Sequence, residues 1–542
     1  MTDAPRLDAH TALAPRLGWL VFAVALLPRL VHVWFLRDSP LAGQYVPDVS
    51  VYLYLAQKML TGGFFFVHPM LMSPGYSLFI TPILATLGPN VPALVLLAAL
   101  LDAGSAVLCA GLATRIAPTG LEQRAGLCTG LLYALCGPLL FNALLPLAEG
   151  PAIFCLLLGV TLLLRSPGGG NLRPYLGGLL FGLGCLLRPN MAPAALLLCL
   201  AWSLLGAGVQ HRPSSARTRL HASARFLLAM LLALLPFMAH NLLTQGRPTP
   251  FGLQGGLTFH MANFPGASGA GDSLPGITHT PYIEALQAQA EASRRVGRQL
   301  SLAEADSYWM SEGWRFFREQ PGQAAALLVK KSLMLINEHG RDPSADIDFC
   351  RQFSPVPGLL ALPISLCFAL GAVGLWRRAG KTPEAAALAV ALVWGAASVV
   401  LFLVTPRYRT VLLPLVLCFA GCAVAELPAL LRLTTRQGLA PALLFISILG
   451  LGNIPLSALV DTNSAAEEYA RLGRYQFLTG HQPEASAALD AALALLSKEA
   501  GTKNQGGEEQ DAQDTELLLA MRQASLALGN AAATNSGTTT NP

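Results

Sequence analysis

Long apolar segments recur along most of the chain and dominate its hydrophobic pattern. Between residues 18 and 459 many reach about 17–25 residues, the length at which a helix crosses a bilayer. This pattern predicts an all-α, polytopic membrane protein with about eleven spans, outer loops and a small α-helical C-terminal tail. We place the spans at 18–36, 91–113, 124–145, 147–164, 175–187, 191–208, 223–243, 356–376, 384–404, 411–431 and 439–459, of which 175–187 is short.

The composition excludes an ordinary soluble protein. Of the 542 residues, 53% are hydrophobic and only 12% are charged, whereas soluble domains carry about 25% charged residues. The net charge of +5 is a sum over loops on two sides of a membrane, so we expect no nucleic-acid partner. Nine of the ten cysteines lie in apolar stretches, and their spacing indicates neither a disulfide framework nor a metal site. We predict no cofactor and leave dependence on a divalent metal open.

The positions of the basic residues orient the spans. No small-residue cleavage site follows the first apolar run, so we interpret it as a retained helix after a cytoplasmic N-terminus, residues 1–17. Residues 18–459 then form the membrane core, with outer loops 37–90 and 244–355 and two amphipathic helices at 281–300 and 302–319. The inner loops collect the basic residues that the positive-inside rule requires, namely Arg115, Arg124, Arg165, Arg173, Arg212, Arg217, Arg219, Arg225, Arg377, Arg378, Lys381, Arg432 and Arg436.

The tail, residues 460–542, differs from the core in composition. It carries eleven acidic and five basic residues, and its first part predicts two helices around a glycine-containing turn, with a second pair near 515–530. A solvated hairpin without a partner and a module that docks a protein are both compatible with this pattern. The first pair resembles a tetratricopeptide repeat at Tyr469, Leu472, Gly473, Tyr475, Gly480, Ala485, Ala491 and Ala492.

The segment PRYR places two arginines on the outer side, against the general charge bias. Arg407 and Arg409 flank Tyr408 and lie between two apolar runs. Guanidinium groups so placed suit a phosphate or pyrophosphate, because each can grip two oxygens. The alternative is that they anchor a helix end by snorkelling to lipid headgroups. We favour binding, since anchoring needs no second arginine.

The first outer loop contains a candidate acid and a turn. Asp48 comes just before a helical pattern, where a carboxylate can cap the helix or act as a general base toward an acceptor hydroxyl. His68 and Tyr76 lie on either side of the turn-forming Pro74 and Gly75, and both are candidate substrate contacts.

Two further ionisable residues lie at predicted outer helix ends. Glu149 stands between two spans, and Arg188 precedes Pro189, which breaks a helix. Ionisable groups at such depth indicate a functional site. The alternative is a structural ion pair of Glu149 with Arg188 or Arg29, while Asp102 in its apolar run is a polar helix contact.

The glycine-rich segment after the seventh span adds amide side chains. Gln254 and Asn263 stand among glycines that permit close backbone approach, and amides suit sugar hydroxyls. Both are candidate substrate-binding residues.

In their order along the chain these motifs resemble the membrane glycosyltransferases of the GT-C superfamily. The closest likeness is to the branch of protein O-mannosyltransferases and of the aminoarabinose and Rgt-type lipopolysaccharide sugar transferases. It covers roughly residues 15–455 and rests on the Asp after the first span, the SPGY turn, LAE, GLGCLLRPN, HNLLTQGRPTPF and the outer PRYR.

The resemblance implies transfer of a sugar from a polyprenyl-phosphate donor to an acceptor outside the membrane, usually with inversion. It also implies a multi-pass protein of the inner (plasma) membrane with its active site and tail on the periplasmic side. Asp48 would be the first-loop catalytic acid, Glu149 the second acidic position, and Arg407 and Arg409 the arginines near the carrier phosphate. Many relatives have a second acid directly after the first, where this chain has Val49, which favours a mechanism without metal.

The acceptor stays open among a glycan, a lipid and a protein, and the tail is a possible site for a protein partner. A transporter or flippase of a lipid-linked sugar is the alternative function, with Glu149, Arg188 and Arg29 along a path. The chain shows no similarly interrupted halves that would indicate inverted repeats. A non-catalytic scaffold is a third possibility, which the charged residues in and beside the spans disfavour.

Overall fold

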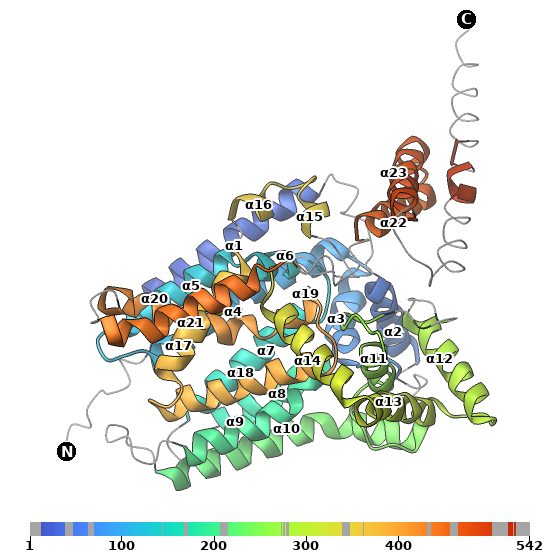
Figure 1. The fold of residues 1–542 in the computed structure, drawn as a ribbon. Coiled ribbons are helices and arrows are strands. Elements are labelled where there is room, and N and C mark those ends of the chain that lie inside the picture. The colour runs from blue at the N-terminus through green and yellow to red at the C-terminus, as the bar shows by residue number, and fades with distance from the viewer. Residues whose placement is uncertain are drawn as a thin grey trace, which may run out of the picture.

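The computed structural model is helical (Figure 1). Within the residues that it describes no strand forms, and an isolated backbone bridge joins Cys136 and Leu362. The predicted all-α fold class is therefore confirmed. The described residues are 12–37, 47–62, 70–143, 145–166, 172–205, 215–272, 274, 277, 281–338, 347–360, 362–430, 435–455, 464–500, 519–523 and 525–526.

Several described helices are long and apolar enough to cross a membrane, as a multi-pass membrane protein requires. Five meet both criteria: α1 (Pro15–Leu36), α4 (Val91–Ile116), α10 (Ala216–Gln245), α18 (Pro383–Leu401) and α20 (Leu413–Leu430). Shorter apolar helices accompany them: α3 (Gly75–Leu87), α7 (Glu149–Leu164), α8 (Arg173–Leu187), α9 (Ala192–Leu204) and α21 (Thr435–Gly452). The predicted number of eleven spans stays a prediction, since several of these helices are short.

Two predicted spans, 124–145 and 356–376, are interrupted, and the interruptions meet. A proline stands in the first turn of the helix after one break and directly before the helix after the other, where its missing N–H prevents a continuous helix. The N–H of Leu362 donates to the carbonyl of Leu135 at 2.7 Å, so backbone groups freed at one break are satisfied at the other. The pieces are α5 (Glu122–Leu135), α6 (Gly137–Asn142), α16 (Val356–Leu360) and α17 (Ile364–Arg378).

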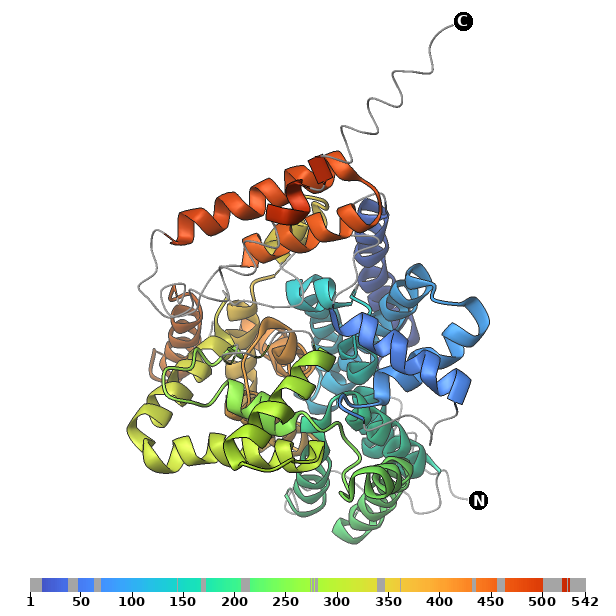
Figure 2. The same ribbon diagram turned by 90° about the vertical axis from the view of Figure 1, so that its right-hand side faces the viewer.

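A layer of helices lies over one end of the bundle (Figure 2), and we call it the outer layer for its place around that end. Both amphipathic helices expected there are present as α12 and α13, and a capping box between Ser301 and Glu304 begins α13. Hydropathy did not indicate α14, which packs against α18 and α21. The layer consists of α2 (Pro47–Gly62), α11 (Gly255–Met261), α12 (Pro281–Val296), α13 (Leu302–Glu319), α14 and α15, of which the last two span Pro321–Ile336 and Ile347–Cys350.

The tail begins with the expected helix pair, α22 (Ser464–Leu478) and α23 (Gln482–Ala500). The turn between them contains Gly480 at a φ of 84°, a conformation that favours glycine. Phe349 of α15 packs with Leu472 and Ala488, which attaches the pair to the outer layer. Most of the second pair predicted near 515–530 lies outside the described residues, so the likeness to a tetratricopeptide repeat stays a prediction.

Glycines allow the closest helix contacts in the bundle. A Cβ added to Gly177 of α8 would lie 2.8 Å from the carbonyl oxygen of Gly159 in α7. One added to Gly178 would collide with the carbonyl of Phe226 in α10. Small residues at these crossings let the backbones of α7, α8 and α10 approach closely, as in other membrane helix bundles.

We expect Gly178→Ala to destabilise the bundle by about 1–3 kcal/mol, because the added methyl group overpacks a backbone contact. The matched control is Gly450→Ala in α21, where an added Cβ meets no atom within 4 Å and alanine favours the helix. Thermal unfolding in detergent compares the variants. A midpoint for Gly178→Ala equal to that of the control would contradict the close crossing of α8 and α10.

Candidate functional site

Four charged side chains from distant parts of the chain meet at the end of the bundle beneath α2. Arg407, in the one-turn helix α19 (Pro406–Arg409), donates from Nη1 to Oδ2 of Asp48 at 2.7 Å. Its Nε lies 3.2 Å from Oε1 of Glu149, which also forms an ion pair with Arg188. We call Asp48, Glu149, Arg188 and Arg407 the charge cluster.

Each member of the charge cluster stands at a helix end, which explains why they meet at one level. Asp48 and Glu149 lie in the first turns of α2 and α7, where the helix dipole favours a carboxylate. Arg188 is the C-cap of α8 and precedes the short 3₁₀ helix η3, Pro189–Met191. The N–H of Tyr408 bonds to the Thr405 side chain at 3.3 Å and so fixes the start of α19.

The predicted ion pair of Glu149 with Arg188 is present, and the alternative pairing with Arg29 is wrong. Arg29 instead forms a buried ion pair with Asp102. Asp102 also accepts a hydrogen bond from the Tyr133 hydroxyl at 2.7 Å. Asp102 is therefore more than a polar helix contact, because it neutralises a buried arginine within the bundle.

The charge cluster is buried at Glu149 and partly exposed at Arg407 and Asp48. The side chain of Glu149 is 2% exposed, whereas those of Arg407 and Asp48 are 11% and 16% exposed. A buried carboxylate needs opposite charges nearby, and the two arginines supply them. Two cations and two anions balance formally, and an anion that displaced Asp48 would meet the guanidinium group of Arg407, which shares Glu149 with Arg188.

Aromatic rings line the charge cluster. The guanidinium carbon atoms of Arg188 and Arg407 lie 4.7 and 5.3 Å from the centre of the Tyr408 ring, a favourable cation–π geometry. The rings of Tyr52 and Tyr76 meet edge to face at 4.9 Å. Burial and the negative charge of Asp48 raise the pKa of the Tyr52 hydroxyl, so it stays protonated and able to donate.

Arg409 points to a different part of the molecule from Arg407. It is buried and donates to the carbonyl of Met334 at 3.0 Å and to that of Asn337. These carbonyls lie at the C-terminal end of α14, where a cation satisfies the exposed backbone acceptors. The placement favours a structural role for Arg409, whereas a role at the carrier phosphate stays untested.

Asn263 is also part of an internal link. Its side chain is fully buried, and its amide nitrogen donates to the carbonyl of Leu401 at 3.0 Å. Its oxygen accepts a hydrogen bond from Nζ of Lys331 at 2.8 Å, and Nζ also donates to the carbonyl of Phe402 at 2.7 Å. The outer layer is thereby tied to the end of α18, three residues before Thr405.

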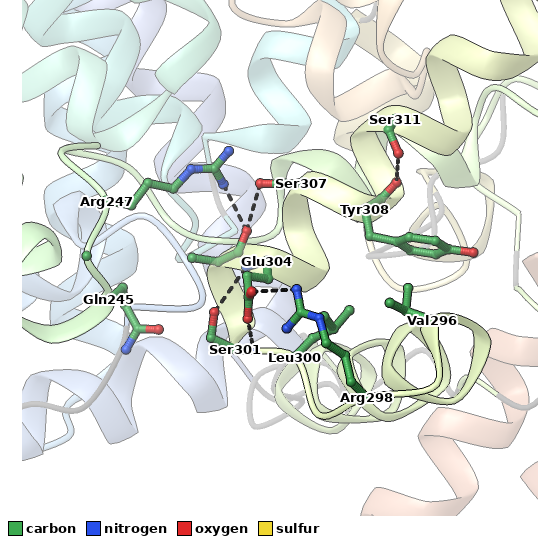
Figure 3. A pocket seen from close by; sticks show the side chains of 12 residues that line it. Gln245, Arg247, Val296, Arg298, Leu300, Ser301, Glu304, Ser307, Tyr308 and Ser311 are labelled. Atoms are coloured by element: carbon green, nitrogen blue, oxygen red, sulfur yellow. Dashed lines mark hydrogen bonds and ion pairs between the residues drawn. The ribbon is translucent and has the colours of Figure 1, made fainter.

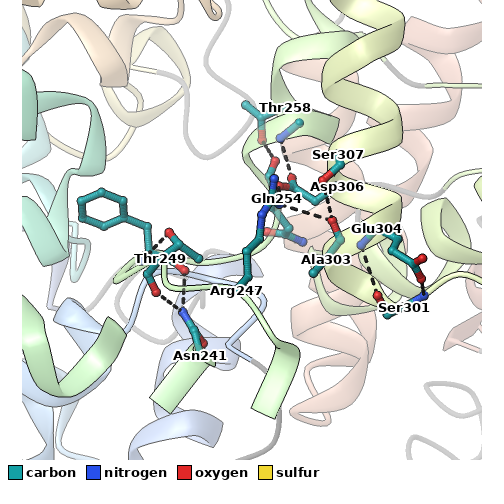
Figure 4. A network of polar contacts seen from close by, with 12 residues as sticks. Asn241, Arg247, Thr249, Gln254, Thr258, Ser301, Ala303, Glu304, Asp306 and Ser307 are labelled. Atoms are coloured by element: carbon teal, nitrogen blue, oxygen red, sulfur yellow. Dashed lines mark hydrogen bonds and ion pairs between the residues drawn. The ribbon is translucent and has the colours of Figure 1, made fainter. Parts of the chain in front are cut away.

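Gln254 begins α11 in the outer layer, beside an ion pair of Arg247 with Asp306 at 2.9 Å (Figure 4). The same aspartate accepts a hydrogen bond from the N–H of Gly256 at 2.5 Å. A groove of about 540 Å³ opens next to this network, with Tyr308 and Arg298 in its lining (Figure 3). No member of the charge cluster lines this groove.

The other two candidates from the first outer loop have different outcomes. Tyr76 is buried beside Tyr52 and packs in an apolar cluster that includes Ala56 of α2. His68 lies outside the described residues. Whether either residue touches a substrate stays a prediction.

Three residues near these contacts were missed from the sequence. Tyr52 lies one helical turn after Asp48, a spacing that places both on one face of α2. Lys331 sits in a helix that hydropathy did not indicate. Glu284 lies in the first turn of α12 and had the appearance of a solvated residue on an amphipathic helix, with no local signal for its position.

Comparison with known proteins gives a likeness in structure only. No protein-family model and no curated protein matches the sequence. The chain is similar to the Archaeoglobus fulgidus oligosaccharyltransferase in its apo form, with 13% identity and a TM-score of 0.42, over 83% of this chain and 58% of that one. It is similar to ArnT from Cupriavidus metallidurans bound to undecaprenyl phosphate, with 13% identity and a TM-score of 0.41, over 96% of this chain and 79% of that one.

The fold and the charge cluster together define a helical, multi-pass membrane protein with a polar site at one end of its bundle. Across the described part of the chain, no three His, Cys, Asp or Glu side chains gather in a way that could hold a metal ion.

Lys331 generates a prediction about pH. Burial lowers the pKa of its ammonium group to about 7, an effect that Asp272 partly opposes. The unfolded chain therefore binds more protons than the folded one above about pH 7, and this contribution to stability rises with pH up to the ordinary lysine range. We expect the unfolding midpoint of wild type, relative to Lys331→Met, to rise between about pH 7 and about pH 9. Parallel unfolding midpoints of the two proteins across this range would contradict the lowered pKa of Lys331.

Proposed function

We propose that this protein transfers a sugar from a polyprenyl-phosphate donor to an acceptor on the outer side of the plasma membrane. The observation that carries the proposal is the pair of arginines, Arg407 and Arg188, held by Glu149 at one end of an apolar helical bundle. A lipid-linked phosphate places its chain among apolar helices and its headgroup at their ends. The charge cluster occupies the corresponding position in this chain.

The chemistry of the leaving group explains the arginines. When the bond between the anomeric carbon and the phosphate oxygen breaks, negative charge develops on the phosphate. Guanidinium groups fixed in advance stabilise that charge without reorganising, and each grips oxygens in pairs. The ring of Tyr408 supports both arginines through cation–π contacts. A single displacement by the acceptor would invert the anomeric centre.

The two acids act chiefly by positioning in this proposal. Glu149 holds the arginines from the buried side, and Asp48 holds Arg407 from the α2 side. Both would fix where the donor phosphate sits, and Asp48 is the more exposed of the two. Tyr76 would support α2 through its contact with Tyr52, and His68 is a further candidate for contact with the substrate.

The acceptor would be a glycan, a lipid or a protein that approaches from the outer layer. The groove beside α13 and the candidate Gln254 belong to that layer. The tail packs on α15 of the same layer, which would suit a role in choosing the acceptor or docking a protein partner.

The transporter alternative required Glu149, Arg188 and Arg29 to line one path. Arg29 is fully buried and belongs to a separate ion pair with Asp102. This division favours a single binding site over a continuous polar path.

Lysine substitutions distinguish a phosphate site from a lipid anchor. We expect Arg407→Lys to insert normally and to lose on the order of tenfold or more in transfer, equivalent to about 1.4 kcal/mol of transition-state stabilisation. Lysine keeps the charge but not the paired grip. The lipid-anchor interpretation expects lysine to serve nearly as well.

Arg409→Lys is the matched control within the same helix. Because Arg409 bonds to backbone carbonyls of α14, we expect it to lower the unfolding midpoint and to retain binding of undecaprenyl phosphate. Transfer from a panel of polyprenyl-phosphate sugars, and binding of undecaprenyl phosphate alone, are measured for both variants. Unchanged values for Arg407→Lys would remove the phosphate site.

Asp48→Asn tests the acid on the other side of Arg407. The amide keeps the shape and most of the capping ability of Asp48 but loses the charge that orients the guanidinium. We expect the variant to fold and insert normally and to lose most sugar transfer. Near wild-type turnover by the purified variant would exclude Asp48 from the site.

A further inference from the structure

The charge cluster can bind the donor phosphate, but the reaction also needs a group that accepts the proton of the acceptor. A hydroxyl or amino group that attacks an anomeric carbon must lose a proton during the reaction. Both carboxylates of the cluster already engage arginines: Asp48 engages Arg407, and Glu149 engages Arg407 and Arg188. These contacts give both carboxylates a place in holding the arginines, which leaves the proton acceptor unassigned.

A third carboxylate lies across the surface of α2. The helix α12 packs against α2, and Figure 1 shows the two side by side at the outer end of the molecule. Glu284 lies in the first turn of α12, next to the buried Ala285, and is itself half-buried. Among the described residues Glu284 forms no ion pair, in contrast to Asp48.

The surroundings of the Glu284 carboxyl raise its basicity. Burial, and then the negative charge of Asp48, raise the pKa of the Glu284 carboxyl to about 7. A carboxyl group whose pKa lies near neutral pH is suited to proton transfer. The helices α2 and α13 pack on α12. Of their ionisable residues, which include Asp48, Tyr52, Lys58, Asp306, Tyr308 and Glu312, only Asp48 changes the pKa of the Glu284 carboxyl.

We propose that Glu284 is the general base of the transfer reaction, while Asp48 serves to hold Arg407 on the leaving phosphate. The inference rests on the proposed function. The acceptor O–H or N–H bond breaks and its proton passes to the Glu284 carboxylate. The acceptor atom then bonds to the anomeric carbon, and the electron pair of the broken carbon–oxygen bond stays on the polyprenyl phosphate beside the arginines. The proton is later released from Glu284 to water.

The test compares full-length wild type with Glu284→Gln and Glu284→Asp, supplied with the same panel of polyprenyl-phosphate sugars and acceptors. We expect Glu284→Gln to lose roughly a hundredfold or more in transfer, the usual contribution of a general base, and to bind undecaprenyl phosphate as wild type does. Glu284→Asp keeps a carboxylate and should recover part of the rate. The control is Glu291→Gln, two turns further along α12, where the carboxylate pairs with Arg294 and Arg295. It should transfer at the wild-type rate.

The pH profile supplies a readout that a merely structural role would not change. Wild-type kcat/KM should fall tenfold per pH unit below about pH 7, where Glu284 becomes protonated, and this acid limb should be absent from the residual activity of Glu284→Gln. Transfer by Glu284→Gln at the wild-type rate, an unchanged acid limb, or loss of undecaprenyl phosphate binding would each overturn the assignment. Absence of any transfer by wild type would instead overturn the proposed function, and the inference with it.

Discussion

The bond of one buried carboxylate to two arginines is the interaction on which the rest of the site depends. Glu149 is almost without exposure to solvent, and it reaches Arg188 at the end of α8 and Arg407 in α19. Charged groups so poorly hydrated are stable only with opposite charges beside them. The consecutive helices α7 and α8 and the distant α19 are therefore held at one point, and the Tyr408 ring and Asp48 complete the arrangement around them.

Hydropathy predicted the helical membrane core well and failed at its irregularities. A window of apolar residues reports the average solvent of a segment, so it identified the region of α4 and α20. It cannot report a missing backbone N–H, and for that reason it extended one span through Pro138 and another through Pro363. It also passed over α14, whose Lys331 is buried against Asn263 and Phe402.

All four members of the charge cluster were singled out from the sequence, but their contacts with one another were only partly foreseen. The pairing of Glu149 with Arg188 was one of two pairings considered, because opposite charges at helix ends need each other, and the structure contains it. The difference between Arg407 and Arg409 was not, since both belong to one short motif and only the tertiary structure places them on opposite sides of α19. The position of Glu284 relative to α2 depends on the packing of α12 against α2. No residue spacing within either helix reveals that position.

The double duty of Glu149 means that the charge cluster has no separable parts. Removing Glu149 leaves the guanidinium groups of Arg188 and Arg407 together beside the Tyr408 ring, so the loss includes their mutual repulsion as well as two attractions. If one of the two arginines is removed first, this repulsion no longer adds to the cost of removing Glu149. Energies of substitution in such a set do not add, and the harm done by one change depends on which residue was altered before it. Replacing a carboxylate and a guanidinium group together should therefore cost less than the sum of the two single replacements.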